Sequence, residues 1–285
     1  NDAFLTAPIG TGPYVVESFT PNDQGTFVVN ERYREPNKPY FSGVLFKGGG
    51  DAVSAGRAVV QTGEFDFAWN VQAEPAVLKQ MQEQGGKGTV QTDSPTSVER
   101  LLFNFSDPNK EVDGQRSEIN TPHPFWSDPE VRKALSLATD RNTIANQFYL
   151  GGDLEPPATN ILTGIASLES KNTSFKFDID AANSTLDAAG WTKNGDVREK
   201  NGVQLKIVYS TTINAVRQKT QQLNKQNWEK AGFKVQLKSI DAGTFFDSNA
   251  GNEQNAQHFY ADMLMYTNGP QDPHPLQYFS SWYGG

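Results

Sequence analysis

Residues 125–151 read FWSDPEVRKALSLATDRNTIANQFYLG, and this stretch predicts two consecutive helices. Asp128 followed by Pro129 gives the first helix an N-cap with proline at the first helical position. Ser127 and Glu130 offer an alternative start, because their S-x-x-E spacing forms a capping box. The helix pair separates the chain into an earlier and a later half.

One apolar stripe runs along each predicted helix. In the first helix, apolar residues recur at i, i+3, i+4 and i+7. These residues are Val131, Ala134, Leu135 and Ala138. Asp140 caps the second helix, in which Ile144 and Phe148 lie one turn apart, and Gly151 marks the expected left-handed end.

The composition excludes several classes of protein. The chain has 285 residues, a net charge of −8 and no cysteine. This length suits two lobes or one large α/β domain. The negative charge argues against general binding to nucleic acids or anionic membranes. The lack of cysteine excludes disulfides, thiolate metal sites and cysteine nucleophiles, and no apolar run approaches the length of about 20 residues that spans a bilayer.

The half before the helix pair is predicted to be mixed α/β. A rigid turn at residues 10–14, GTGPY, leads into a hairpin around residues 21–25. Strands are expected at residues 15–19, 26–30, 44–47, 65–69, 89–92 and 98–105, and helices at residues 51–61 and 74–83.

The half after the helix pair is predicted to be α/β as well. Helices are expected at residues 178–190, from residue 214 to 231 and at 244–247, and strands at residues 203–209, 233–237 and 262–266. The order strand, long helix, strand over residues 203–237 is a βαβ unit. Such a unit requires a parallel sheet and a right-handed crossover.

Aromatic residues beside small polar residues end three of the predicted strands. They are Trp69-Asn70, Tyr209-Ser210-Thr211 and Tyr266-Thr267-Asn268. In open α/β sheets, ligands bind beyond the carboxyl ends of the strands. These groups therefore predict a neutral polar ligand, held by stacking on the rings and by hydrogen bonds. The alternative, that each aromatic side chain only completes the core, stays open.

The common catalytic and metal-binding motifs are absent from the sequence. Residues 48–50, GGG, match neither phosphate-loop pattern, and no G-x-S-x-G elbow is present. The histidines lack a partner ligand at helical i, i+4 spacing. These histidines are His123, His258 and His274. The sequence therefore predicts a protein that is not an enzyme and has no metal site and no cofactor.

A set of short motifs follows one order along the chain. They are GTGPY at 10–14, KPY at 38–40, GEFD at 63–66, the block at 125–151, AAGW at 188–191, AGFKV at 231–235 and DP at 272–273. This ordered set resembles the bacterial extracellular solute-binding proteins of the peptide/nickel type, family 5. The block at 125–151 is similar to that family's F-x-D-x-x-V-R-x-A-L…D-R-x-x-I…G pattern. The resemblance spans nearly the whole chain.

The resemblance implies an α/β, two-lobed fold of the periplasmic-binding-protein type (type II), which closes on its ligand at a hinge. Residues 1–98 then form the remainder of lobe I, and residues 99–285 form lobe II. The N-terminal segment, a small extra domain and the C-terminal return to lobe I are expected outside this chain. A monomer is expected, acting outside the cytoplasm in the periplasm or as a lipoprotein, with the permease subunits of an ABC importer as its partner.

The resemblance also bears on the ligand. In the family's peptide binders, an Asp shortly before the D-P pair anchors the peptide amine. Gly269 takes that place here, or Gln271 in an alignment shifted by two residues. The missing carboxylate removes a charge-assisted hydrogen bond worth roughly 1.5–3 kcal/mol, unless Asp272 or a segment outside this chain provides one.

Several ligands therefore stay open. A peptide is favoured by the family, and a neutral polar solute such as an oligosaccharide is favoured by the strand ends. A nickel or metal-chelate ligand rests only on His274, and a sensor, a chaperone or a hydrolase is an alternative from another class. Arg132 and Arg141 are assigned to the helical scaffold. The predicted ligand-binding residues are Trp69, Asn70, Tyr209, Thr211, Tyr266, Thr267, Asn268, Gln271 and Asp272.

Overall fold

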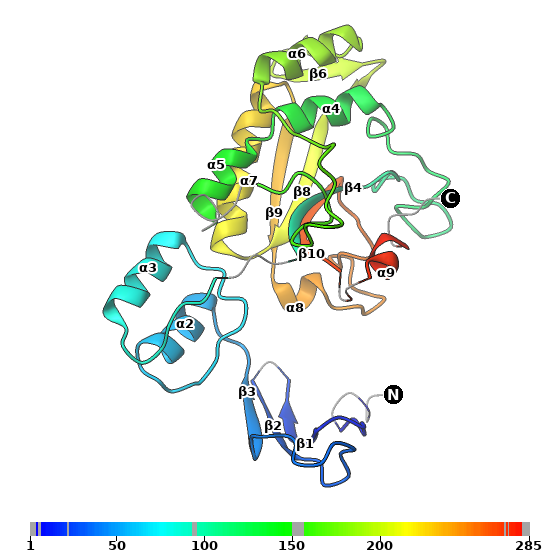
Figure 1. Cartoon of the computed structure of the whole chain (residues 1–285). Coiled ribbons are helices and arrows are strands. Elements are labelled where there is room, and N and C mark those ends of the chain that lie inside the picture. The colour runs from blue at the N-terminus through cyan, green and yellow to red at the C-terminus, as the bar shows by residue number, and fades with distance from the viewer. Residues whose placement is uncertain are drawn as a thin grey trace. The chain divides into compact units, whose positions relative to one another are not determined.

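The computed structural model describes residues 4, 7–21, 23–92, 96–149, 157–270, 272 and 274–280 (Figure 1). Of the patterns above, Gly151, Gln271 and Pro273 lie outside the described residues, as do Asn22 of the predicted hairpin and Leu150 of the opening stretch. The chain divides into two compact units. The first consists of Asn1–Val71 and Met81–Thr89, and the second of Gln72–Gln80 and Val90–Gly285. A lobe boundary at residue 98 stays a prediction.

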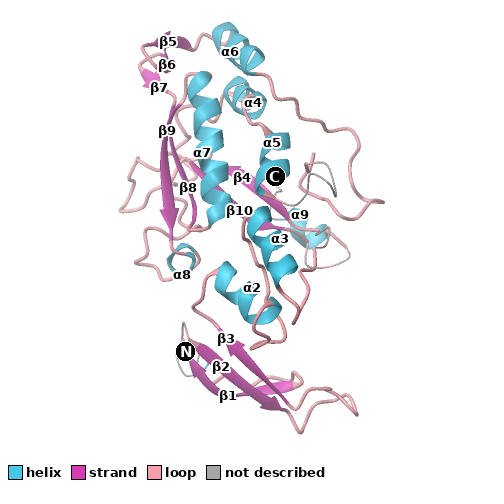
Figure 2. Cartoon of the chain, turned by 90° about the vertical axis from the view of Figure 1, so that its left-hand side faces the viewer, coloured by secondary structure: helices cyan, strands magenta, loops and turns pink. Residues whose placement is uncertain are grey.

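The first unit contains a three-stranded antiparallel sheet in the order β1-β2-β3 (Figure 2). Its strands are β1 (Tyr14–Thr20), β2 (Gln24–Val29) and β3 (Gly43–Lys47). The predicted hairpin is confirmed by the pairing of β1 with β2, and the third predicted strand by the pairing of β3 with β2.

Helix α2 (Ala52–Val60) follows this sheet and begins at the predicted position. Asp51 caps it, because its Oδ1 accepts hydrogen bonds from the Val53 and Ser54 amides at 2.9 and 3.0 Å. The hydrogen bonds from Ser54 hold the pKa of the Asp51 carboxyl below its usual value. The second predicted helix is confirmed as α3 (Pro75–Gln84).

The strand predicted at residues 65–69 is wrong. These residues join no ladder; instead the Phe65 amide donates to the Ala58 carbonyl at 3.2 Å, so the chain turns back on the end of α2. The aromatic side chains of this segment are exposed, Phe67 by 77% and Trp69 by 80%.

The strand predicted at residues 89–92 is also wrong, because these residues belong to no ladder. The chain before them follows α2 closely. The Lys87 amide donates to the Val60 carbonyl at 3.1 Å, and a Cβ on Gly85 would lie 2.6 Å from Val60 Cγ1. The docking of this segment on α2 therefore takes the place of strand pairing.

A four-stranded sheet in the order β4-β10-β8-β9 forms the centre of the second unit. Its strands are β4 (Val98–Phe103), β8 (Lys206–Thr212), β9 (Lys234–Ile240) and β10 (Met263–Asn268). β8 pairs parallel with both β9 and β10, and β4 pairs antiparallel with β10. Helix α7 (Ala215–Lys230) joins β8 to β9 and packs along both strands (Figure 1). The predicted βαβ unit is confirmed.

The opening stretch forms α4 (Pro129–Leu137) and α5 (Arg141–Phe148), as predicted. Asp128 rather than Ser127 caps α4: its Oδ1 accepts from the Glu130 amide at 3.0 Å, and its Oδ2 accepts from the Trp191 indole at 3.1 Å. The predicted apolar stripe of α4 is at most 1% exposed.

Both arginines of this stretch make contacts within the second unit. Arg132 donates to the Trp126 carbonyl. Arg141 donates to the Ser136 carbonyl at 3.1 Å and lies 4.0 Å from the Phe175 ring centroid. Burial lowers the pKa of Arg141 to about 10. These contacts support the assignment of both residues to the scaffold.

Shorter elements complete the second unit. They are α6 (Ile179–Ala188), β5 (Thr192–Asn194), β6 (Val197–Lys200), β7 (Val203–Gln204), α8 (Ala242–Phe245) and α9 (Leu276–Ser280). The strand predicted at residues 203–209 is thus divided between β7 and β8. None of the helices in the described part of the chain is long and apolar enough to cross a membrane.

The core of the second unit lies on both faces of its sheet. On the α7 face, Tyr209, Met263 and Met265 pack with Trp126 and Trp228, and each is at most 1% exposed. On the other face, the smaller cluster contains Ile240, Phe245, Ala261 and Leu264. The predicted α/β class is confirmed.

Candidate functional site

One edge of the second unit's sheet collects the carboxyl ends of its parallel strands. Because β8, β9 and β10 run in the same direction, they end at this edge, and antiparallel β4 begins there. We call this place the carboxyl edge; it consists of residues 98–100, 211–213, 240–246 and 266–269. Open α/β sheets bind ligands at such an edge.

A buried ion pair lies at the carboxyl edge. The Arg217 Nε–H donates to both carboxylate oxygens of Glu99 at 3.2 Å, and Nη2 donates to Oε2 at 3.1 Å. Nη1 donates to the Thr212 hydroxyl at 2.6 Å, and the Thr267 hydroxyl donates to Glu99 Oε2 at 2.7 Å. The side chains of Arg217 and Glu99 are only 9% and 16% exposed. The two charges therefore neutralise each other within the fold.

Neither Glu99 nor Arg217 was predicted from the sequence. Arg217 lies in the first turn of α7, where the helix dipole disfavours a positive charge. That position indicates a nearby carboxylate. The strand register provides it, because Glu99 lies opposite Thr267 across the β4–β10 pair.

Tyr209 and Thr211 lie in the core, with 0% exposure. The Tyr209 hydroxyl is 2.8 Å from Met265 Sδ, and the Thr211 hydroxyl donates to the Met265 carbonyl at 2.6 Å. Burial raises the pKa of Tyr209 well above its usual value. Their side chains join β8 to β10 and offer no surface to a solute.

Tyr266 is half-buried and lies among aromatic rings and a cation. Its ring centroid is 6.0 Å from that of Phe245 and 5.8 Å from that of Phe246, both in edge-on geometry. Arg100 Cζ lies 5.3 Å from the Tyr266 centroid, and Arg100 Nη1 donates to the Tyr278 hydroxyl at 3.1 Å. Tyr266 thus has a fixed orientation at the edge.

The end of β10 is exposed and its backbone is tightly held. Thr267 and Asn268 are both exposed, and Asn268 Oδ1 accepts from the Gly269 amide at 2.8 Å. A Cβ on Gly269 would lie 2.5 Å from the Thr96 carbonyl oxygen and 2.7 Å from Ser97 Cα. No side chain fits at residue 269, so this position cannot carry an anchoring carboxylate.

The remaining predicted residues lie elsewhere. Trp69 and Asn70 belong to the first unit, where Trp69 is exposed and Asn70 has the left-handed φ of 56°. Asp272 is exposed, and Gln271 lies outside the described residues.

The histidines form no metal cluster in the described part of the chain, where no group of three or more His, Cys, Asp or Glu side chains could hold a metal ion. His123 is buried and lies 2.9 Å from Asp262 Oδ1 through its Nε2. His258 Nδ1 lies 2.8 Å from the Asn252 carbonyl oxygen. Their contacts are therefore internal to the fold.

Known proteins resemble this chain over most of its length. A model of the family described as bacterial extracellular solute-binding proteins, family 5 Middle, matches residues 1–285. The oligopeptide-binding protein OppA of Lactococcus lactis subsp. lactis (strain IL1403) is 28% identical over 239 residues, which cover 81% of this chain and 38% of that protein. The glutathione-binding protein GsiB of Escherichia coli (strain K12) is 23% identical over 236 residues, covering 83% and 40%.

Solved structures share the fold. The structure of lactococcal OppA complexed with an endogenous peptide in the closed conformation matches with a TM-score of 0.72 and 20% identity. The matched region covers 93% of this chain and 49% of the lactococcal OppA chain. The chain thus spans half or less of the length of the proteins that it matches.

Proposed function

Because the chain belongs to the bacterial extracellular solute-binding proteins of family 5, we propose that it binds a peptide for an ABC importer. Members of this family have a two-lobed, periplasmic-binding-protein-like fold and act outside the cytoplasm. The observation that carries the proposal is the exposed end of β10 at the carboxyl edge, on a chain similar to an oligopeptide-binding protein. Delivery to permease subunits, a lipid anchor and the absence of catalysis belong to the same proposal.

The proposed ligand contacts come from two places. At the carboxyl edge, the exposed amide of Asn268 provides hydrogen-bonding groups for a peptide backbone, and Tyr266 provides a ring. Thr267 remains a proposed contact beside them, with its hydroxyl donating to Glu99 Oε2. In the first unit, Trp69 and Asn70 provide a second aromatic and amide pair. Gln271 and Asp272 remain proposed contacts, whereas Tyr209 and Thr211 act by holding β8 against β10.

A second candidate function is the binding of a neutral polar solute such as an oligosaccharide. It is favoured by the 80% exposure of Trp69, whose face can stack on a sugar ring. The neutralised Glu99–Arg217 pair is compatible with an uncharged ligand. The two candidates differ in the mass of the bound ligand.

Native mass spectrometry of the protein, purified without refolding, tests the proposal. We expect a co-purified peptide mass; a sugar mass without peptide supports the second candidate and overturns the first. Catalytic turnover of the bound ligand overturns the binding role itself. A thermal-shift screen complements the experiment, because a ligand present at 100 Kd adds about 2.7 kcal/mol to the free energy of unfolding.

A further inference from the structure

A pocket of about 380 Å³ lies at the amino ends of β8 and β9, at the opposite end of these strands from the carboxyl edge. We call it the amino-end pocket. Its volume falls within the range of small-molecule sites, about 300–1,000 Å³. Polar side chains from the loop after β4, from β7, β8 and β9, and from the residue before β10 line it: Asn109, Gln204, Lys206, Lys234, Gln236 and Asp262.

Two lysines lie opposite each other across the β8–β9 pair in this pocket. Lys206 is in register with Lys234, and both residues are exposed. Neighbouring strands are about 4.8 Å apart, and like charges directly opposite each other destabilise a sheet. Neither ammonium group has an ion-pair partner among the described residues, whereas Lys200 and Lys225 each pair with a carboxylate. The fold therefore places two positive charges side by side at the pocket without a paired anion.

Protection of the sheet edge explains only part of this arrangement. Lysines on an edge strand keep a sheet from pairing with another sheet, and β9 is an edge strand, so this role accounts for Lys234 and Lys238. Lys206 belongs to β8, which lies between β9 and β10 in the sheet. Its charge adds repulsion at the position of Lys234 and gives no further protection to the edge. An anion held between the two ammonium groups would offset that repulsion.

The acidic groups at the pocket are bound to other partners. Asp262 is 5% exposed; its Oδ1 lies 2.9 Å from His123 Nε2, and its Oδ2 accepts from the Val208 amide at 2.6 Å. Asp107, two residues before Asn109, accepts from the Asn109 amide at 2.8 Å. The buried charge of Asp262 disfavours an anion deep in the pocket. An anionic group is therefore favoured only at the exposed lysine side chains.

Apolar side chains complete the lining, since Phe125 and Val208 also contribute to the pocket. We propose that the amino-end pocket binds a small organic acid, with its carboxylate between Lys206 and Lys234 and its apolar body against Phe125 and Val208. Gln236 lies two residues after Lys234 on the same face of β9 and is exposed, so it offers an amide donor to the same carboxylate. This site is separate from the carboxyl edge and does not depend on the proposed peptide-binding function.

An NMR titration of the isotope-labelled protein tests this site with three probes: hexanoate, hexanamide and acetate. Hexanamide keeps the apolar body without the charge, and acetate keeps the charge without most of the body. We expect hexanoate to bind saturably and to shift the backbone amides of residues 204–208 and 234–236. It should bind about tenfold more tightly than hexanamide, because two ion pairs are lost in the amide, and about tenfold or more tightly than acetate, because less apolar surface is buried.

Lys206→Gln and, separately, Lys234→Gln should each weaken hexanoate binding about two- to fivefold, the value of an exposed ion pair, and leave hexanamide binding unchanged. Lys238→Gln is the matched control, because Lys238 is an exposed lysine on the same face of β9 that does not line the pocket. It should change neither affinity, and thermal unfolding should show the same transition for all three variants.

Three outcomes would overturn the organic-acid site. They are the lack of saturable hexanoate binding, equal affinity for hexanoate and hexanamide, and an equal loss of hexanoate affinity in all three lysine variants. The last would mean that hexanoate responds only to the net charge of the protein. None of these outcomes bears on the carboxyl edge, because native mass spectrometry tests the proposed peptide binding separately.

Discussion

The two ends of β10 differ in how their side chains are satisfied. Before β10, Asp262 is 5% exposed; its Oδ1 lies 2.9 Å from His123 Nε2, and its Oδ2 accepts from the Val208 amide at 2.6 Å. At the last residue of β10, the Asn268 side chain is exposed, and its Oδ1 accepts from the adjacent Gly269 amide at 2.8 Å. The amino end buries its polar groups in a closed network, whereas the carboxyl end combines the buried Glu99–Arg217 pair with the exposed side chain of Asn268.

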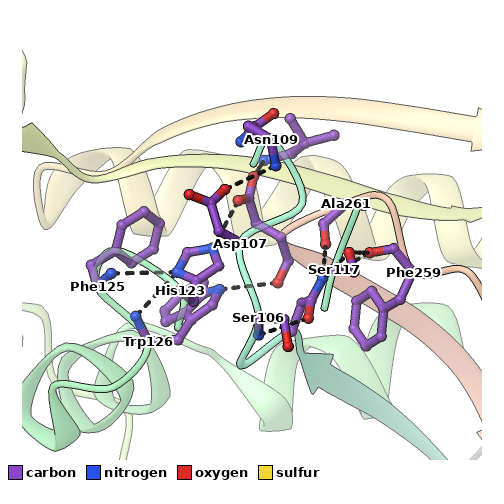
Figure 3. A network of polar contacts seen from close by, with 12 residues as sticks. Ser106, Asp107, Asn109, Ser117, His123, Phe125, Trp126, Phe259 and Ala261 are labelled. Carbon is purple, nitrogen blue, oxygen red and sulfur yellow. Dashed lines mark hydrogen bonds and ion pairs between the residues drawn. The ribbon is translucent and has the colours of Figure 1, made fainter. Parts of the chain in front are cut away.

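The network at the amino end joins several loops (Figure 3). His123 Nδ1 accepts from the Trp126 amide at 3.2 Å. Asn104 Nδ2 donates to the Phe259 carbonyl at 2.7 Å and to the Ser117 hydroxyl at 3.0 Å. Ser117 and Phe259 have left-handed φ angles of 57° and 54°. A left-handed φ on a residue other than glycine costs free energy, and it persists only where surrounding contacts hold the backbone in place. The polar groups of this network therefore stabilise the fold.

Asp262→Ala should have the largest effect on stability. It leaves His123 and the Val208 amide buried without their acceptor, which costs about 3–5 kcal/mol in the free energy of unfolding. Urea denaturation followed by fluorescence measures the change. Asp196→Ala, at an exposed carboxylate in a hairpin turn, serves as the control and should shift stability by no more than about 0.5 kcal/mol. A small effect of Asp262→Ala would contradict the structural role of the network.

Gly269→Ala should have the next largest effect on stability. It tests how tightly the backbone is packed at the carboxyl end of β10. The added Cβ would meet the Thr96 carbonyl oxygen at 2.5 Å, so the start of β4 or the end of β10 must move. We expect a loss of about 1–3 kcal/mol in the free energy of unfolding and a weaker affinity for peptide. Gly251→Ala is the control, because its nearest neighbour is an Asn249 side-chain oxygen at 3.6 Å. An unchanged transition would show that the edge backbone can adapt.

The sequence predicted local structure better than the environment of single side chains. Asp128 and Asp140 were identified as caps because a cap and its helix are adjacent in the chain. The alternating pattern could not tell buried Tyr209 from half-buried Tyr266, since both belong to apolar strands. Tyr209 lies in the larger cluster with Trp228 of α7, whereas Tyr266 packs against the smaller cluster. Glu99 and Arg217 are 118 residues apart, so their pairing depends on strand order rather than on local pattern.

Asp128→Asn tests a partly exposed polar group and should have a smaller, pH-dependent effect. Burial acts to raise the pKa of Asp128, but hydrogen bonds from the Trp191 indole and the Glu130 amide, with the charge of Lys200, hold it below its usual value of 3.8. A lowered pKa in the folded state means that the ionised carboxylate stabilises the fold above pH 3.8, and that this contribution disappears as the pH falls through the folded-state pKa.

Urea denaturation of the unaltered protein and of Asp128→Asn from about pH 6 to about pH 2 measures this contribution. Asparagine is also a good N-cap, so α4 keeps its start in the variant. The unaltered protein should lose stability relative to the variant as the pH falls, and the difference should be constant at higher pH. A difference that is independent of pH would show that Asp128 acts only as a neutral cap.

Asn268→Ala should have the smallest effect on stability and sharpens the contrast between the ends of β10. Its side chain is exposed, so the free energy of unfolding should change by no more than about 0.5 kcal/mol. The loss of one amide that bonds a peptide backbone should nevertheless weaken binding by about three- to tenfold, the value of a net hydrogen bond. Isothermal titration calorimetry with a peptide that the unaltered protein binds measures the affinity. The control is Asn142→Ala, at an exposed position of α5. If Asn268→Ala lowered stability as Asp262→Ala does while affinity stayed the same, the end of β10 would be structural, and the ligand contacts would have to come from Trp69 and Asn70.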